Sequence, residues 1–294
     1  MNGDFGELLT AMVTPFDEKD GVNLPKVKEL ARFLIDSGSD GLVVLGTTGE
    51  VPTLTGEEKR DILKAVVEVV GDEAKIIAGT GSYSTSASIE TTRMAEEIGV
   101  DGIMAVVPYY NKPPQDGLYQ HFSKIANSTE LPVMLYNVPG RTSRNLEVST
   151  VSKLSEIKNI VAVKEASGDV SQAADICRRT EDNFKVYSGE DSLTLPILSV
   201  GGQGVVSVAA HLVGSKMKKM ITAFKNGDIY KAQSLNDELC PVFKGVFITT
   251  NPIPVKTALN MLGHEVGGLR SPLLELNNSE KQVLKGILEN CDLL

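Results

Sequence analysis

The chain has 294 residues, of which 41% are hydrophobic and 23% are charged, and its formal net charge is -9. This composition is typical of a globular protein with one sizeable core, and neither glycine nor proline is frequent enough to indicate disorder. Acidic and basic residues are interleaved, so no basic face is available for the phosphates of a nucleic acid, and we expect no nucleic-acid partner.

Eight short apolar runs, rich in β-branched residues, alternate with amphipathic stretches along the first three quarters of the chain. Continuously apolar runs are typical of parallel strands that are covered on both sides. The helical stretches carry start signals: Pro25 suits a first turn, and Thr55 with Glu58 has the spacing of a capping box. In chain order the predicted strands are 8–13, 41–45, 75–78, 102–107, 132–136, 160–163, 184–187 and 204–208.

The strand-helix unit recurs roughly every 20 to 30 residues, which predicts an α/β fold of the (β/α)8 TIM-barrel type. A doubly wound sheet is the alternative, but it usually has a glycine-rich loop after its first strand, whereas Thr14-Pro15-Phe16 stands there. From about residue 215 onward the pattern is helical only. We predict a catalytic barrel over residues 1–225 and a C-terminal helical extension over residues 226–294 that packs on the barrel.

Nothing in the cysteine content or the hydropathy indicates export. The three cysteines, Cys177, Cys240 and Cys291, are odd in number and far apart, which fits neither a disulfide framework nor a zinc site. No apolar run is long enough to cross a membrane, and the first residues lack the features of a secretion signal. We expect a cytoplasmic protein without a membrane partner.

Lys164 directly follows the apolar run 160–163, at the end of the sixth predicted strand. In a (β/α)8 barrel the reactive groups lie where strands end, and burial there disfavours the charged form of an amine. A neutral lysine amine attacks a carbonyl to form an imine, and the protonated imine then stabilises an enamine. A solvated lysine at a strand end is the alternative. We predict that Lys164 is the nucleophile that captures a 2-oxo acid.

Tyr136 ends the neighbouring strand, so its hydroxyl is a candidate acid and base at an imine on Lys164. Because the reference pKa of tyrosine is about 10, the hydroxyl needs hydrogen-bond partners to move protons at neutral pH. Thr48 and Tyr110 carry the hydroxyls available for such a relay. A purely structural tyrosine at the barrel mouth is the alternative.

Two further strand ends suit the binding of carboxylates. Thr47 and Thr48 lie between Gly46 and Gly49 in a tight turn whose backbone N–H groups could hold a small carboxylate. Arg141 follows a proline and a glycine and suits bidentate capture of a second carboxylate. A surface salt bridge is the alternative for Arg141.

Other chemistries fit the sequence less well. His121, His211 and His264 have no metal-ligand spacing with one another or with cysteine, so we expect no metal. The glycine-rich segment 201–204 precedes the eighth predicted strand instead of leading into a helix, which argues against a phosphate site and against pyridoxal phosphate. We expect no cofactor beyond the covalent imine on Lys164.

Six motifs follow one another along the chain: 46–50 (GTTGE), 108–113 (PYYNKP), 136–142 (YNVPGRT), 163–166 (VKEA), 188–191 (SGED) and 251–256 (NPIPVK). Together they closely resemble the dihydrodipicolinate synthase (4-hydroxy-tetrahydrodipicolinate synthase) family, in the superfamily of pyruvate-dependent class I aldolases and N-acetylneuraminate lyase. The resemblance covers essentially the whole chain, and six motifs in order are far more specific than any one of them.

The resemblance implies condensation of pyruvate with L-aspartate 4-semialdehyde to 4-hydroxy-tetrahydrodipicolinate, the first step of the branch leading to diaminopimelate and lysine. It implies that Lys164 forms the pyruvate imine and that Tyr136 exchanges protons with Thr48 and with Tyr110 of a neighbouring subunit. It also implies a homotetramer built as a dimer of dimers. The substrate-binding residues that it implies are Thr47 and Thr48 for the pyruvate carboxylate, Arg141 for the semialdehyde carboxylate, and backbone groups near Gly189 and Val206.

The chain departs from lysine-inhibited relatives, which carry a polar, histidine-containing effector pocket near the dimer interface. The matching positions are Val51, Gly56, Lys59, Tyr83 and Ala87, and we expect weak or absent feedback inhibition by lysine. Two other functions stay open: another pyruvate lyase of the superfamily, such as N-acetylneuraminate lyase or a 2-keto-3-deoxy-sugar acid aldolase, and a non-catalytic relative that binds a 2-oxo acid. Arg141 favours the synthase, because sugar-cleaving relatives need hydroxyl-binding groups at this position.

Overall fold

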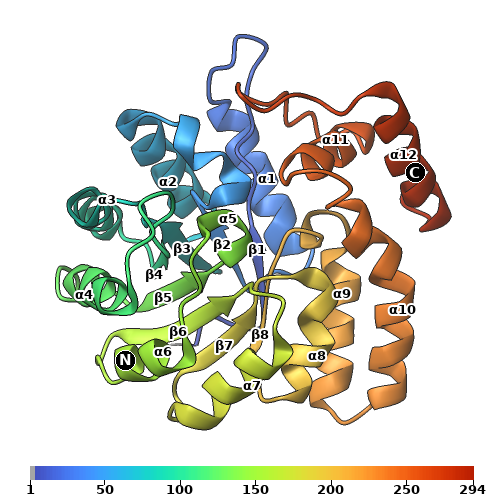
Figure 1. Ribbon diagram of the computed structural model, residues 1–294. Coiled ribbons are helices and arrows are strands. Elements are labelled where there is room, and N and C mark those ends of the chain that lie inside the picture. The colour runs from blue at the N-terminus through green and yellow to red at the C-terminus, as the bar shows by residue number, and fades with distance from the viewer. Residues whose placement is uncertain (1–3) are drawn as a thin grey trace.

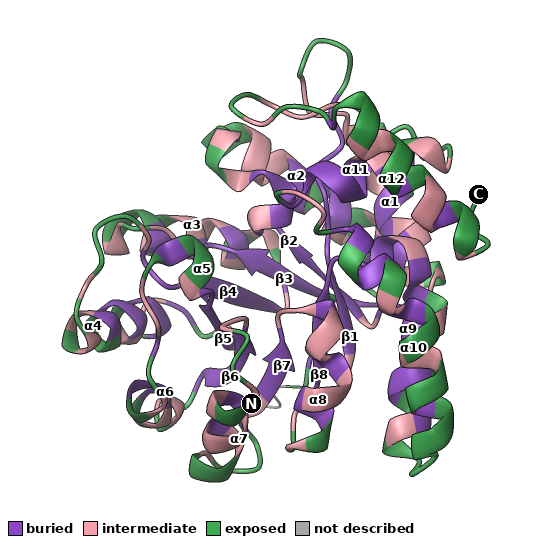
Figure 2. Cartoon of the chain, turned by 45° about the vertical axis from the view of Figure 1, so that its right-hand side comes forward, coloured by how far each residue is buried: buried purple, intermediate pink, exposed green. Residues whose placement is uncertain are grey.

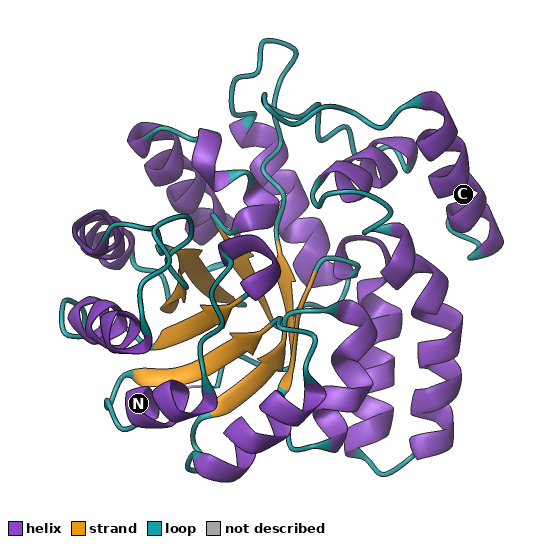
Figure 3. Cartoon of the chain, viewed as in Figure 1, coloured by secondary structure: helices purple, strands orange, loops and turns teal. Residues whose placement is uncertain are grey.

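A computed structural model of the chain describes residues 4–294. Eight parallel strands close into a barrel in sequence order, with β1 hydrogen-bonded to both β2 and β8. The ring of strands lies inside a layer of helices (Figures 1 and 3). The strands are β1 Leu8–Ala11, β2 Gly41–Val44, β3 Lys75–Gly79, β4 Gly102–Val106, β5 Val133–Asn137, β6 Ile160–Glu165, β7 Lys185–Ser188 and β8 Gly204–Ser207.

These strands confirm the predicted barrel, with small differences at their ends. β1 ends at Ala11 and not at Val13, whereas β6 continues to Glu165, so Lys164 lies within the strand ladder. Eight helices follow the strands around the barrel, together with a one-turn helix after β5. They are α1 Leu24–Asp36, α2 Gly56–Val70, α3 Thr85–Ile98, α4 Gln115–Ala126, α5 Pro139–Thr142, α6 Val148–Ser155, α7 Val170–Arg179, α8 Thr194–Ser199 and α9 Ala210–Lys225.

Local chemistry sets the helix starts as the sequence predicts. Pro25 lies in the first turn of α1, where its missing N–H costs nothing. At α2 the hydroxyl of Thr55 accepts a hydrogen bond from the backbone N–H of Glu58, and the Glu58 carboxylate accepts one from the N–H of Thr55. This reciprocal arrangement confirms the capping box. It fixes where the chain enters α2 after the GTTGE turn.

The hydrophobic core has two layers, as expected for a barrel with side chains inside and helices outside. The inner layer fills the barrel with side chains such as Leu9, Ile77, Met134 and Val206, and the outer layer lies between strands and helices. Figure 2 shows the strands almost entirely buried and the outer faces of the helices exposed. The barrel is therefore a packed core, and a cavity can open only at its ends.

After α9 the chain continues with α10 Ile229–Gly245, α11 Ile253–Met261 and α12 Asn278–Asn290. α10 packs along α9, while α11 and α12 lie beyond the end of α10 (Figure 1). α11 and α12 share a small core that includes Ala258, Leu284 and Leu288. The domain boundary between residues 225 and 226 stays a prediction. Within residues 4–294, none of the helices combines the length and apolarity needed to cross a bilayer.

Candidate active site

Lys164 and Tyr136 lie side by side inside the barrel mouth. The register of β5 and β6 pairs Tyr136 with Lys164, and β6 and β7 pair Lys164 with Tyr187. Lys164 is only 5% exposed, and its Nζ lies 4.3 Å from the centre of the Tyr136 ring. The amine that the sequence predicts as nucleophile is thus held against the tyrosine that the sequence predicts as its proton-transfer partner.

Burial makes this amine unusually easy to deprotonate. Loss of water lowers the pKa of Lys164 to about 8, the nearby Asp191 carboxylate opposes the shift, and the positive charge of Arg141 adds to it. At pH 7 a pKa of about 8 leaves roughly a tenth of the amines neutral, against less than a thousandth at the ordinary value. Lys164 therefore has the two properties that a Schiff-base nucleophile needs, enclosure and a depressed pKa.

A cavity of about 560 Å³ opens above Lys164. Its walls come from the ends of β2, β5, β6, β7 and β8, from the end of α10 and from the segment that joins α10 to α11. The lining residues are Thr47, Thr48, Tyr136, Val138, Arg141, Lys164, Ala166, Gly189, Glu190, Asp191, Ser192, Val208, Phe243, Lys244, Phe247 and Asn251. Five strand ends meet there, and residues of the C-terminal extension line the remaining side.

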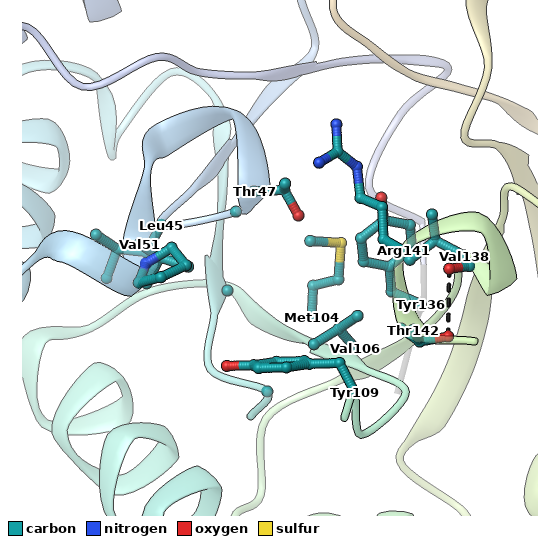
Figure 4. Close-up of a pocket in the computed structure, with 14 residues that line it drawn as sticks. Leu45, Thr47, Val51, Met104, Val106, Tyr109, Tyr136, Val138, Arg141 and Thr142 are labelled. Carbon is teal, nitrogen blue, oxygen red and sulfur yellow. Dashed lines mark hydrogen bonds between the residues drawn. The ribbon is translucent and has the colours of Figure 1, made fainter. Parts of the chain in front are cut away.

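A second, mainly apolar cavity of about 190 Å³ adjoins the first. Thr47, Tyr136, Val138 and Arg141 line both cavities. In Figure 4 the guanidinium of Arg141 and the hydroxyls of Thr47 and Tyr136 converge at the upper part of this cavity, above Met104 and Val106. The polar groups therefore gather where the two cavities meet.

Asp191 is a buried carboxylate at the Lys164 cavity, and the sequence alone indicates no role for it. It accepts hydrogen bonds from the Ser207 hydroxyl and from the backbone N–H groups of Val208 and Ala209, at the start of α9. Burial raises the pKa of Asp191, and these three donors oppose the rise. The signal in the sequence was its position just after the seventh strand. Asp191 supplies the negative charge that faces the Lys164 amine.

The structure distinguishes between the two threonines. Burial raises the pKa of Tyr136, and the charge of Arg141 and the side chain of Thr47 oppose that rise. The hydroxyl of Thr48 instead accepts a hydrogen bond from Asn251 Nδ2 at 2.9 Å. Residues 47–49 form a 3₁₀ turn, in which successive side chains point in directions about 120° apart. The threonine side chain that affects the pKa of Tyr136 is therefore that of Thr47, whereas Thr48, the predicted relay partner, is bonded to Asn251.

Arg141 and Gly189 lie where the sequence predicts them. Arg141 is on the one-turn helix α5, and its Nη2 donates to the Asn251 carbonyl oxygen at 3.2 Å. Gly189 approaches the amine so closely that a Cβ there would lie 2.6 Å from Ala166 Cβ and 3.2 Å from Lys164 Cε. A side chain at position 189 would press on Lys164.

Two predicted site residues are not brought to the cavity. Val206 is buried on β8 among the inner-layer side chains, below the residues that line the cavity. Tyr110 is 93% exposed and lines neither cavity within one chain, whereas its neighbour Tyr109 lines the apolar cavity and packs edge-on against Tyr83 at 5.3 Å. A role for Tyr110 at Lys164 therefore requires a second copy of the chain.

A closed (β/α)8 barrel whose mouth holds a buried, readily deprotonated lysine beside a tyrosine defines a lyase of the class I aldolase type. Within that class, the chain belongs to the Dihydrodipicolinate synthetase family, whose model matches residues 4–291. This confirms the resemblance inferred from the six motifs.

Individual relatives agree over the full length. The 4-hydroxy-tetrahydrodipicolinate synthase of Desulforudis audaxviator is 58% identical over 294 residues, which is 100% of both chains. The crystal structure of a dihydrodipicolinate synthase from Bacillus anthracis is 52% identical, with a TM-score of 0.95, over 97% of this chain and 98% of the other. A lysine-bound structure of the enzyme from Cyanidioschyzon merolae is 45% identical, with a TM-score of 0.97 and 99% coverage of both chains.

Proposed function

We propose that this chain condenses pyruvate with L-aspartate 4-semialdehyde to give 4-hydroxy-tetrahydrodipicolinate, the first step of the branch leading to diaminopimelate and lysine. The observation that carries the proposal is the buried Lys164 amine, 4.3 Å from the Tyr136 ring, in a cavity that also presents Arg141. The 58% identity to a synthase over the whole chain supports the same conclusion.

In the proposed reaction the neutral Lys164 amine attacks the C2 carbonyl of pyruvate and releases water, leaving a protonated imine. Loss of a methyl proton gives an enamine, whose carbon attacks the aldehyde of the second substrate and turns it into an alcohol. The amino group of that substrate then attacks the imine carbon, closes the ring and frees Lys164. One water is released overall, and no cofactor is required because the lysine imine is the electron sink.

The protein groups have separate tasks in this scheme. Tyr136, whose pKa is raised by burial and only partly brought back by Arg141 and Thr47, carries protons to and from the reacting carbon and oxygen. Thr48 and the backbone of the 47–49 turn hold the pyruvate carboxylate. Arg141, on the open side of the cavity, binds the carboxylate of the semialdehyde.

Borohydride reduction in the presence of pyruvate tests the first half of the proposal. Reduction traps the imine as a stable secondary amine, and mass spectrometry locates it. We expect a single adduct on Lys164 and none in Lys164→Met. A turnover assay with aspartate semialdehyde, with N-acetylneuraminate and with 2-keto-3-deoxy-sugar acids tests the second half. An adduct on another lysine, or turnover of a sugar acid in place of the semialdehyde, would overturn the proposal.

We also propose that the active form is a homotetramer, built as a dimer of dimers, in which Tyr110 of one subunit completes the site of its neighbour. The exposure of Tyr110, at 93%, and of Tyr83, at 56%, supports a contact between copies at this loop. Sedimentation velocity should show tetramers, and specific activity should fall on dilution below the dissociation constant. Full activity of isolated single chains would contradict this assembly. We also propose that the protein is located in the cytoplasm.

Feedback inhibition by lysine should be weak or absent. Gly56, Lys59 and Ala87, three of the positions that match the effector pocket of inhibited relatives, line a surface groove between α2 and α3, and none of the three supplies a histidine. Steady-state assays with added lysine measure the effect directly. Strong inhibition at sub-millimolar lysine would overturn this expectation.

A further inference from the structure

Glu165, the residue after the nucleophile, is a buried carboxylate without a cationic partner among residues 4–294. It is 2% exposed. Its Oε1 accepts from the backbone N–H of Ser167 at 2.7 Å, and its Oε2 accepts from Gln172 Nε2 at 2.9 Å. Asn137 Nδ2 lies 3.2 Å and 3.0 Å from the two oxygens. Burying a carboxyl group is costly unless hydrogen bonds compensate for the lost water, and three donor groups converge on this one, so a packing role alone is a poor explanation for a glutamate here.

Glu165 and Asn137 form a pair behind the catalytic pair. Asn137 follows Tyr136 on β5 as Glu165 follows Lys164 on β6, and the two are register partners. Successive side chains of a strand point to opposite faces. Tyr136 and Lys164 therefore face the barrel interior while Asn137 and Glu165 face the helices. The outer hydrogen bonds join the two strand ends directly behind the pair in which Lys164 Nζ lies 4.3 Å from the centre of the Tyr136 ring.

Asn137 and Gln172, the two side chains that donate to Glu165, also hold the segment that carries Arg141. Asn137 Oδ1 accepts from the backbone N–H of Leu146 at 2.9 Å, and Asn137 Nδ2 donates to Asn145 Oδ1 at 2.8 Å. Asn145 Nδ2 in turn donates to Gln172 Oε1 at 2.7 Å. The segment 138–144 thus leaves the barrel at Asn137 and returns at Asn145, and both ends are bonded to one network centred on Glu165.

We propose that Glu165 is a positioning residue that holds the imine-forming pair and the Arg141 segment in one fixed geometry. This inference rests on the proposed function, because it assigns Arg141 to the second substrate. A carboxylate suits the task since it offers acceptors in several directions at once, whereas a glutamine would turn one acceptor into a donor that faces Asn137 and Gln172. Glu165 acts through Lys164, Tyr136 and Arg141 and does not touch the substrates.

The test is Glu165→Gln, compared with the double variant Glu165→Gln/Gln172→Glu, in which donor and acceptor change places and the bond between the two side chains can form again. Asn159→Asp is the matched control: the Asn159 amide, at the opposite end of the same strand, donates to the carbonyl oxygens of Ala126, Thr129 and Leu131. Its loss lowers stability without touching the barrel mouth. Four quantities are measured: melting temperature, rate of pyruvate trapping by borohydride, kcat, and KM for each substrate.

In Glu165→Gln we expect pyruvate trapping to slow and KM for aspartate semialdehyde to rise, with kcat/KM for the semialdehyde falling about ten- to a hundred-fold, as small misplacements of reacting groups do. The double variant should recover part of that loss, because it restores the bond between residues 165 and 172 while the contact with Asn137 stays changed. Asn159→Asp should melt earlier with wild-type kinetics. Wild-type kinetics in Glu165→Gln, a double variant no better than the single one, or an equal kinetic loss in Asn159→Asp would each overturn the proposal.

Asn145→Ala covers the case in which Glu165→Gln does not fold, because Asn145 is only partly buried. It should raise KM for the semialdehyde and leave pyruvate trapping unchanged, and an unchanged KM would overturn the role of the network at the Arg141 segment. The wild-type enzyme separates this proposal from the proposed function. If it traps pyruvate on Lys164 but does not condense the semialdehyde, the proposed function fails, while trapping rates in the variants still test the coupling of β5 and β6.

Discussion

Glu50 and Lys256 form a buried ion pair that joins residues 206 positions apart, with 2.9 Å between Glu50 Oε1 and Lys256 Nζ and both side chains 1% exposed. Lys256 Nζ also donates to the carbonyl oxygen of Thr14, and Glu50 Oε2 accepts from the backbone N–H of Arg270. Glu50 ends the GTTGE turn and Lys256 lies on α11. The ion pair therefore ties the C-terminal extension to the loop that presents Thr47 and Thr48.

Replacing Lys256 by methionine should destabilise the protein by about 3–5 kcal/mol, because it leaves the Glu50 carboxylate buried without its partner. Glu50→Gln/Lys256→Met should lose less, since neither charge remains. Thermal and urea unfolding measure both effects. Lys281→Met is the matched control, because the Lys281–Glu275 pair lies at the surface and should change stability little. A single variant as stable as the wild type would show that the pair does not hold the extension.

The rate of imine formation should rise with pH and level off above about 8, where Lys164 loses its proton. The negative charge of Asp191 raises the pKa of Lys164, so Asp191→Asn should move this midpoint to lower pH. Ser207→Ala should move it in the same direction by less, because the Ser207 hydroxyl stabilises the Asp191 charge. Borohydride trapping with pyruvate, measured across the pH range, gives the midpoints. An unchanged midpoint, or a rise, in Asp191→Asn would contradict the assigned contact.

Thr47→Val and Thr48→Val should separate proton transfer from carboxylate binding. The Thr47 side chain opposes part of the rise that burial causes in the pKa of Tyr136, so its loss should lower kcat by about a hundred-fold, the lower end of what general acid–base catalysis contributes. Thr48 pairs with Asn251, and its loss should mainly raise KM for pyruvate. Steady-state kinetics with both substrates varied give the comparison. A larger fall of kcat in Thr48→Val would restore the relay expected from the sequence.

Gly189→Ala should slow imine formation strongly, because the added methyl would lie 2.6 Å from Ala166 Cβ and 3.2 Å from Lys164 Cε. Removing the Ala166 methyl as well, in Ala166→Gly/Gly189→Ala, relieves the closer of the two contacts and should restore part of the trapping rate. Ala166→Gly alone is the control for backbone effects. Equal trapping rates in Gly189→Ala and the wild type would show that Ala166 and Lys164 move aside without any loss of imine formation.

The barrel and the position of Lys164 were predictable because each depends on a local sequence pattern that can be recognised within one short segment. The apolar run 160–163 identifies a buried strand, and its end places Lys164 at the mouth whatever the rest of the chain does. Tyr136 was predictable for the same reason, since consecutive strands of this fold are neighbours. Arg141 followed from its place just after the fifth strand.

The remaining features of the site depend on side-chain directions and loop paths, which a sequence pattern does not specify. The choice between Thr47 and Thr48 follows from the 3₁₀ turn at 47–49, where a change of one residue redirects a side chain. The contact of Asp191 with Ser207 depends on the path of the loop after β7, which carries Asp191 back over the end of β8. The helical pattern after residue 215 predicted an extension but not that Asn251 would reach the cavity.

The segment between Asn137 and Asn145 is hydrogen-bonded at both ends. Its inner residues can therefore be replaced while its two ends, and the strands behind them, keep their positions. Val138 and Arg141 in this segment line the same cavity as Lys164. On the proposed function, substitutions in the segment that keep the Arg141 charge would change which aldehyde is accepted and leave the activation of pyruvate intact, because Lys164 lies on β6 and Asp191 follows β7. A barrel of this kind can therefore come to accept a different aldehyde through a few substitutions in one segment, while imine formation on the lysine is kept.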